Sequence, residues 1–252
     1  MGGKGGSRHL KRMASPSYWP IHRKENKFVA KPIPGSHTIA ESMPILLALR
    51  EALKYANTKK EAKIILSEKK VKVDGKIVAD EKSSIGLMDV IEVPDLSVAF
   101  RILSHPKKGL ILHQITTDEA MFKLCKIDNK SAVRKGHVQL NLHDGRNLVI
   151  TVKDVKKPDE DVYKTSDVLK ISIPKQEMLG HLRFEEGVFA LVTGGKNVGS
   201  YGKVIAIEKK KGPYPTFITL ESAGGKRLQT TLGYVFAIGR EAPWISVSEV
   251  ET

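Results

Sequence analysis

The lysines at the start of one predicted helix are well suited by type and spacing to bind an anion. Thr58 and Glu61 have the spacing of a capping box, and the helix they start would carry Lys59, Lys60 and Lys63. A cation at a helix N-terminus costs roughly 0.3–1 kcal/mol, because the exposed N–H groups already carry positive partial charge. A phosphate at this position would interact favourably with both the N–H and the ammonium groups. The pattern therefore predicts a phosphate site.

Further lysines extend this predicted site along the chain. Lys54 ends the preceding helix, and four others surround a predicted hairpin: Lys69, Lys70, Lys72 and Lys76. An ordinary solvated lysine face is the alternative interpretation. Two helices followed by a tight hairpin favour the binding site. Because these lysines are a cost without an anion, replacing the three at the helix start with alanine is expected to stabilise the free protein.

The elements that would position these lysines follow from the apolar spacing. A helix is predicted from Pro44, with one apolar stripe formed by Ile45, Leu49, Ala52, Leu53 and Ala56. The second helix, from Thr58, would bury Ala62, Ile65 and Leu66. Alternating residues then lead into Asp74-Gly75, a strong signal for a type I′ hairpin, and residues 89–93 form another alternating strand.

Residues 1–41 differ from the rest of the chain, because they are rich in cations and are interrupted by four prolines. Such an arm can lie along a polyanion and become ordered there, and the alternative is a solvated disordered tail. The candidate contacts in this arm are Arg8, His9, Lys11 and Arg12.

After about residue 100 the patterns predict mainly strands. Residues 137–152 contain two alternating runs around Asp144-Gly145, and residues 167–174 form another strand. Thr117 or Asp118 could cap a single helical turn. From residue 186, short strands with glycine turns have the spacing of a small barrel. The fold class predicted is α+β, mostly β.

The glycine-rich stretch 194–203 is not a P-loop, because Asn197 stands at its first glycine position and Val204 follows the lysine. It resembles a KOW motif, in which a tight turn between two strands would present Lys196 and Lys203 to RNA. Turn geometry alone is the equal alternative for these glycines.

The composition limits the classes of binding partner that this chain can have. The 252 residues have a formal net charge of +14 and a pI near 9.7, which predicts a polyanionic partner such as RNA, DNA or an anionic membrane. A membrane fits least, because the longest aliphatic run is the five residues Ile45–Leu49. The single cysteine, Cys125, excludes an internal disulfide and fits a reducing, cytosolic setting.

The sequence offers no catalytic or metal-binding set. Eight histidines are dispersed without the paired spacing of a metal site. The carboxylate pairs Glu185-Glu186 and Glu160-Asp161 fall in polar, turn-like stretches, and no serine has a nucleophile-elbow context. We expect no catalysis, no metal and no cofactor.

Residues 44–93 resemble the αL RNA-binding motif found in bacterial ribosomal protein four, many pseudouridine synthases and tyrosyl-tRNA synthetases. The matching positions are Thr58-Lys59, Ala62-Lys63, Val71-x-Val73-Asp74-Gly75 and Asp89-x-Ile91-x-Val93. The sequence departs from the motif at Lys69 and Met88, where the motif has glycines. Lysines replace the usual arginines, so the resemblance implies backbone and shape recognition with little reading of bases.

Six blocks in order resemble the archaeal-eukaryotic small-subunit ribosomal protein of the four-e type. They are GSRHLKRMASPSYWPI, ESMPILLALREALKYA, GLMDVIEV, HQITTDEAMFKLCKI, LVTGGKNVGSYGKVIAIE and TTLGYVFAIGREAPWISV. The resemblance implies a structural, cytoplasmic component of the small ribosomal subunit, bound to its ribosomal RNA and to neighbouring ribosomal proteins. We expect neither a membrane partner nor a homo-oligomer. The chain ends soon after Trp244, which favours an archaeal source.

The domains implied are a basic N-terminal arm (1–41), an αL-type helix–helix–hairpin module (42–104), a central β-domain (105–178), a KOW-containing SH3-like barrel (179–240) and a C-terminal tail (241–252). Two other functions are compatible with parts of this sequence. A pseudouridine-synthase-like enzyme would need a large catalytic domain, whereas the chain after residue 105 divides into short β-modules. A transcription-elongation protein would explain the KOW-like segment alone.

Overall fold

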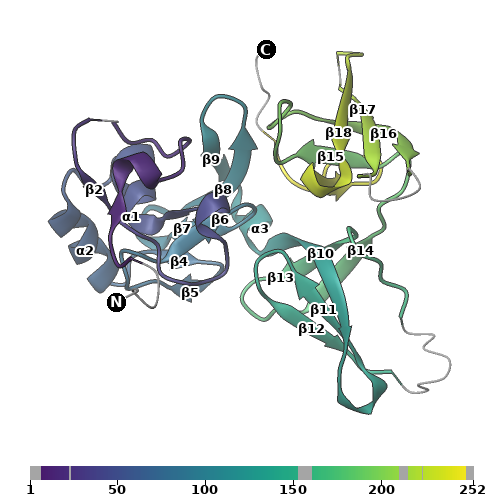
Figure 1. Ribbon diagram of the computed structural model, residues 1–252. Helices are drawn as coiled ribbons and strands as arrows, with labels where there is room; N and C mark the ends of the chain where they lie inside the picture. Colours follow the sequence, from purple (N-terminus) through teal and green to yellow (C-terminus); the bar gives the residue numbers. More distant parts are fainter. Residues whose placement is uncertain (1–6, 23, 153–160, 210–214, 223, 248–252) are drawn as a thin grey trace, which may run out of the picture.

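The computed structural model describes residues 7–22, 24–152, 161–209, 215–222 and 224–247 (Figure 1). Three five-stranded antiparallel sheets account for most of the regular secondary structure in this part of the chain, and its helices are few and short. The prediction of a mostly β, α+β protein is confirmed. Residues 1–6 of the expected arm and 248–252 of the expected tail lie outside the described residues, as does Glu160.

The first sheet has the strand order β5-β4-β7-β8-β9 and shares a core with the helices before it. Leu66 from α2, Ile91 from β7 and Ile102 from β8 all belong to this core. The sheet extends past residue 104. Its strands are β4 (Lys72–Val73), β5 (Lys76–Ile77), β7 (Val90–Val93), β8 (Val98–His105) and β9 (Gly109–Ile115). The helix α2 spans Lys59–Ser67, as expected, and η4 spans Pro94–Leu96.

The helix predicted from Pro44 is not a continuous α-helix, so this expectation was wrong in detail. The α-helical part, α1, covers Ile45–Leu47, and a π-helical turn, η3, covers Ala48–Ala52, where the Leu53 N–H donates to the Ala48 carbonyl at 2.8 Å. A π-turn holds more residues than an α-turn, so positions after it fall out of the 3.6-residue phase. Ala52, which the stripe placed inside, is exposed.

The N-terminal segment, defined as residues 7–22 and 24–41, packs onto this first unit. Its short strands β1 (Leu10–Lys11) and β2 (Phe28–Val29) pair with each other, and β3 (Ser42–Pro44) pairs with β6 (Ser84–Gly86). The turns η1 (Arg12–Ala14) and η2 (Ile39–Glu41) lie between them. Trp19 is only 2% exposed, and its Nε1–H donates to the Ser42 carbonyl at 2.8 Å. The segment is therefore anchored by an aromatic core residue that sequence patterns did not reveal.

The central sheet has the order β12-β11-β10-β13-β14. Its strands are β10 (Phe122–Ala132), β11 (Val138–Leu142), β12 (Asn147–Ile150), β13 (Val168–Ser172) and β14 (Met178–Leu182), and η5 (Arg134–Gly136) joins β10 to β11. The predicted helical turn, α3, covers Thr117–Ala120. Its cap is Thr116, not Thr117 or Asp118, because the Glu119 N–H donates to the Thr116 hydroxyl at 3.4 Å.

The C-terminal sheet has the order β18-β17-β16-β15-β19. Its elements are β15 (Phe189–Val192), β16 (Tyr201–Glu208), β17 (Phe217–Glu221), β18 (Arg227–Thr231), η6 (Leu232–Tyr234) and β19 (Val235–Gly239). Leu103 from β8, Leu124 from β10 and Phe236 from β19 belong to one buried cluster, so all three sheets contribute to a common core.

Candidate nucleic-acid interface

The helix start carries the predicted capping box. The Glu61 N–H donates to the Thr58 hydroxyl oxygen at 3.3 Å, and the Glu61 carboxylate accepts from the backbone of Asn57 at 2.8 Å and of Thr58 at 3.4 Å. The hydrogen bond from Asn57, followed by that from the Thr58 side chain, lowers the pKa of Glu61. The side chains of Thr58 and Glu61 thus satisfy some of the backbone N–H groups at the start of α2.

The lysines at this helix start have an internal partner that sequence reasoning missed. Lys59 Nζ lies 3.0 Å and Lys63 Nζ 3.8 Å from Oε1 of Glu81, while both lysine side chains remain more than half exposed. Glu81 is nearly buried, and its other carboxylate oxygen has no hydrogen-bond partner. Lys60 takes part in none of the ion pairs found among the described residues. The cost of the lysines is therefore partly offset within the protein.

The hairpin after α2 has the predicted geometry, with φ of 49° at Asp74 and 71° at Gly75. Lys72 and Lys76 stand on its two strands, β4 and β5. Lys72 is paired with Ile77 and Lys76 with Val73, so the two lysines lie next to the turn but on opposite faces of the hairpin.

Lys69 closes α2 in the left-handed conformation, with φ of 59°. Its N–H donates to the Leu66 carbonyl at 3.0 Å and the N–H of Lys70 donates to the Ile65 carbonyl at 3.4 Å, which together form a Schellman motif. Lys54 after the π-turn is also left-handed, with φ of 56°. Both lysines are exposed, and Lys70 pairs with Glu68 at 2.6 Å.

The arm residues divide into two groups. Arg8, His9 and Lys11 are exposed. Arg12 is half-buried, and its guanidinium donates to the Ile21 carbonyl at 2.7 Å and to the Ser15 hydroxyl at 2.9 Å. The geometry of Arg12 is that of a residue that holds the segment together.

Lys196 and Lys203 lie far from the other predicted contacts. Both are exposed on the β15–β16 hairpin of the C-terminal sheet, which Figure 1 shows on the opposite side of the molecule from α2. Gly199 of this hairpin has φ of 79°, and a Cβ there would lie 2.5 Å from Pro106 of the β8–β9 turn. The glycine therefore permits both the turn and the contact between sheets.

A buried ion cluster joins the first and central sheets, and the sequence patterns did not reveal it. Lys123 of β10 is fully buried, and its Nζ lies 2.9 Å from Asp74, 2.5 Å from Asp89 and 3.0 Å from Asp144. Two further side chains complete the buried ion cluster: Arg146, which contacts Asp74 and Asp144, and His37, which contacts Asp89 at 3.1 Å. The sequence signal was that Lys123 is one of two lysines, with Lys126, in the otherwise apolar run 121–127.

Contacts within the buried ion cluster favour the charged forms of Lys123 and Asp89. Burial alone would lower the pKa of Lys123, but the carboxylates of Asp89 and Asp74 hold that pKa well above its ordinary value. Burial would likewise raise the pKa of Asp89, and Lys123 and His37 outweigh it, so the pKa of Asp89 is lowered. For Asp74, burial and the nearby Asp89 raise the pKa. The cluster is a structural contact whose members stabilise one another.

One group near the cluster has metal-ligand types, namely Cys125, His143 and Asp144. Burial raises the pKa of the Cys125 thiol well above its usual value and lowers the pKa of His143 to about 4. Asp144 is already occupied by Lys123 and by Arg146, whose positive charges oppose a metal cation. The donor set therefore does not fit a metal ion.

In the part of the chain that the structure describes, no helix has the length and apolar character needed to span a bilayer.

The structure is that of a mostly β protein built from several sheets. Its candidate basic contact residues lie on two separate faces, one near α2 and one on the β15–β16 hairpin. The model of ribosomal family S4e matches residues 97–178, and that of the RS4NT (NUC023) domain matches residues 4–40. The chain belongs to ribosomal family S4e.

The relatives support this assignment over nearly the whole length. The chain is 48% identical to the small ribosomal subunit protein eS4 of Desulfurococcus amylolyticus, with 99% of each covered. It is also 48% identical to the eS4 protein of Methanocaldococcus jannaschii, covering 98% of this chain and 100% of the relative. The crystal structure of the 30S ribosomal protein S4e from Thermoplasma acidophilum is similar, with a TM-score of 0.66 and 31% identity over 79% of this chain and 95% of that one.

Proposed function

We propose that the chain is a structural constituent of the small ribosomal subunit, located in the cytoplasm, where it binds ribosomal RNA and neighbouring ribosomal proteins. The observation that carries this proposal is the 48% identity, over nearly full length, to proteins named small ribosomal subunit protein eS4. The net charge of +14 supports a polyanionic partner. The relatives give no support to the enzyme alternative.

In this proposal residues 42–104 act as an αL RNA-binding module. Two departures from the motif support it, because Lys69 and Met88, which stand where the motif has glycines, have φ of 59° and 66°. The left-handed backbone that glycine favours is thus retained without glycine. The central β-domain would cover 105–178 and the KOW-containing barrel 179–240, with the β15–β16 hairpin presenting Lys196 and Lys203. Strand pairing crosses both boundaries, because β9 pairs with β8 of the first sheet and β14 pairs with β13 of the central sheet.

The proposed contacts are made mainly to the RNA backbone. Lysine ammonium groups act as point charges and do not offer the bidentate fork that reads a base edge. Phosphate contacts by the exposed lysines of α2 and the β4–β5 hairpin would therefore recognise the shape of an RNA helix.

Sedimentation of cell extracts tests the proposal. The chain is expected to travel with the small subunit at one copy per particle, and to remain there after a low-salt wash. A chain that is mostly free, with only trace amounts in the particle, would contradict a structural role and would favour an enzyme that visits the RNA.

A further inference from the structure

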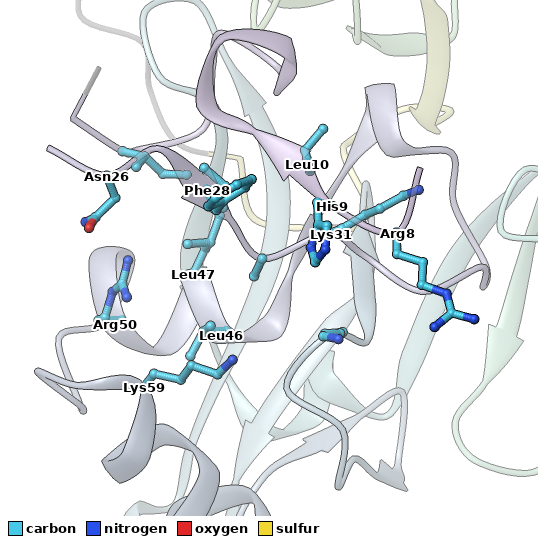
Figure 2. Close-up of a pocket in the computed structure, with 14 residues that line it drawn as sticks. Arg8, His9, Leu10, Asn26, Phe28, Lys31, Leu46, Leu47, Arg50 and Lys59 are labelled. Atoms are coloured by element: carbon cyan, nitrogen blue, oxygen red, sulfur yellow. The ribbon is translucent and has the colours of Figure 1, made fainter. Parts of the chain in front are cut away.

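A pocket of about 370 Å³ lies between the N-terminal segment and the first helices (Figure 2). Leu46 and Leu47, both buried, form its apolar floor, and residues of β1 and β2 line the opposite wall. This volume falls within the roughly 300–1,000 Å³ range of pockets that take small organic groups. The pocket is large enough for one such group and is open to solvent.

The charged residues that line the pocket are all cationic: Arg8, Lys31, Arg50, Lys59 and Lys82. Two have carboxylate partners that lie outside the lining, since Arg50 pairs with Glu51 at 2.7 Å and Lys59 with Glu81 at 3.0 Å. Arg8 and Lys82 take part in no ion pair among the described residues. A ligand with an apolar body and negative charge at its edge therefore fits the pocket.

Phe28 supplies an aromatic surface beside these cations. The residue is 54% exposed, and its ring centroid lies 5.6 Å from that of His9. Figure 2 shows Phe28 above Leu47 and next to Asn26, whose amide can both donate and accept hydrogen bonds. An exposed aromatic ring next to cations is the arrangement on which single-stranded RNA bases stack.

We propose that this pocket holds one unpaired nucleotide of RNA, with its base against Phe28 and its phosphates near Arg8 and Lys82. This inference rests on the proposed function and adds a specific ligand to it. A base inside a regular duplex is stacked between its neighbours and cannot enter, so the nucleotide comes from a bulge, a loop or an end. An acidic peptide segment is the competing occupant, and the exposed ring at the pocket favours the nucleotide.

Variants of the full-length chain that change only the ring provide the first test. Phe28→Leu keeps an apolar side chain without a π face, and we expect it to weaken binding to purified small-subunit ribosomal RNA about 5- to 100-fold. Phe28→Trp should retain affinity, and Met13→Leu, at an exposed position outside the pocket, should bind like the native chain. Chemical probing should show one unpaired base that is protected by the native chain and reactive with Phe28→Leu.

Crosslinking within the assembled subunit tests the occupant directly. With p-benzoylphenylalanine in place of Phe28, we expect a crosslink to a single nucleotide. A crosslink to another protein would overturn the proposal, as would native affinity and native protection with Phe28→Leu. In those cases the native chain still binds the RNA, and only the pocket assignment fails. If the native chain does not bind the RNA at all, the proposed function fails together with the pocket.

Discussion

The lysines at the start of α2 show that a cation at an unfavourable position can be stabilised by a partner within the protein as well as by an external anion. The sequence predicted that Lys59, Lys60 and Lys63 destabilise the free protein, but Glu81 lies within ion-pairing distance of two of them. Removing Lys59 and Lys63 would leave a nearly buried carboxylate without its partners, which is itself destabilising. The stabilisation expected from alanine therefore applies only to Lys60.

Lys69 allows the roles of backbone and charge to be separated. Its φ of 59° costs a non-glycine residue about 1–2 kcal/mol, so Lys69→Gly is expected to raise the free energy of unfolding by about 1 kcal/mol. The same change removes one exposed cation, so the affinity for ribosomal RNA should fall and the log–log salt slope should decrease by about 0.7–0.9. Urea denaturation and filter binding at several salt concentrations measure the two effects.

Lys63→Gly is the matched control, because Lys63 lies inside α2 in ordinary helical conformation. There glycine should lower the free energy of unfolding by about 1 kcal/mol, and the loss of the 3.8 Å contact with Glu81 acts in the same direction. If Lys69→Gly also destabilises the protein, the left-handed position is not strained by lysine.

His143 predicts how stability depends on pH. Its Nδ1 accepts from the Lys126 N–H at 3.2 Å and its Nε2 faces the Leu87 carbonyl at 3.3 Å, which fits the neutral ring. Burial, and then the charge of Lys123, lowers its pKa from 6.5 to about 4. Between these values the unfolded chain binds a proton that the folded chain does not. The free energy of unfolding should therefore fall by on the order of 2 kcal/mol as the pH decreases from 6.5 to 4.5.

Urea denaturation across this pH range measures the slope. His143→Gln should flatten it, whereas His22→Gln, at an exposed position, should leave it unchanged. An unchanged slope in His143→Gln would assign the pH dependence to other groups.

At the scale of elements, the local patterns predicted α2, the β4–β5 hairpin and most strands, because each depends on neighbouring residues. The π-turn at Ala48–Ala52 and the buried position of Trp19 were missed, because both are decided by packing against distant segments. The sequence predicted only turns for the two Asp-Gly pairs, Asp74-Gly75 and Asp144-Gly145. In the second pair Gly145 has φ of 74°, and the Asp144 side chain points into the buried ion cluster. Contacts such as Lys123 to Asp74 join residues 49 positions apart and leave no local pattern.

The buried ion cluster predicts a large effect at one strand position. Lys123→Met removes the cation shared by three aspartates and leaves uncompensated buried charge, which typically costs about 3–5 kcal/mol. We therefore expect a fall of this size in the free energy of unfolding by urea. Lys203→Met, an exposed lysine on β16, is the control and should change it by less than about 0.5 kcal/mol. Equal stability of the two variants would show that the buried ion cluster contributes little.

At the scale of the whole molecule, the candidate contacts lie on two faces that a common core holds together. The helix α2 and the N-terminal segment lie on one side, and the β15–β16 hairpin lies on the other (Figure 1). Composition predicted the polyanionic partner, since a charge of +14 is a property of the entire chain. The separation of the lysines into two faces could not be predicted, because it depends on how three sheets pack.

The buried ion cluster also determines when the N-terminal half can complete its folding during synthesis. Asp74 and Asp89 leave the translating ribosome before their shared partner Lys123, and Arg146 follows later still. Until those cations emerge, the two carboxylates remain hydrated and the nascent first sheet lacks its neighbour. The N-terminal half therefore completes its structure only after more than half of the polypeptide has been synthesised.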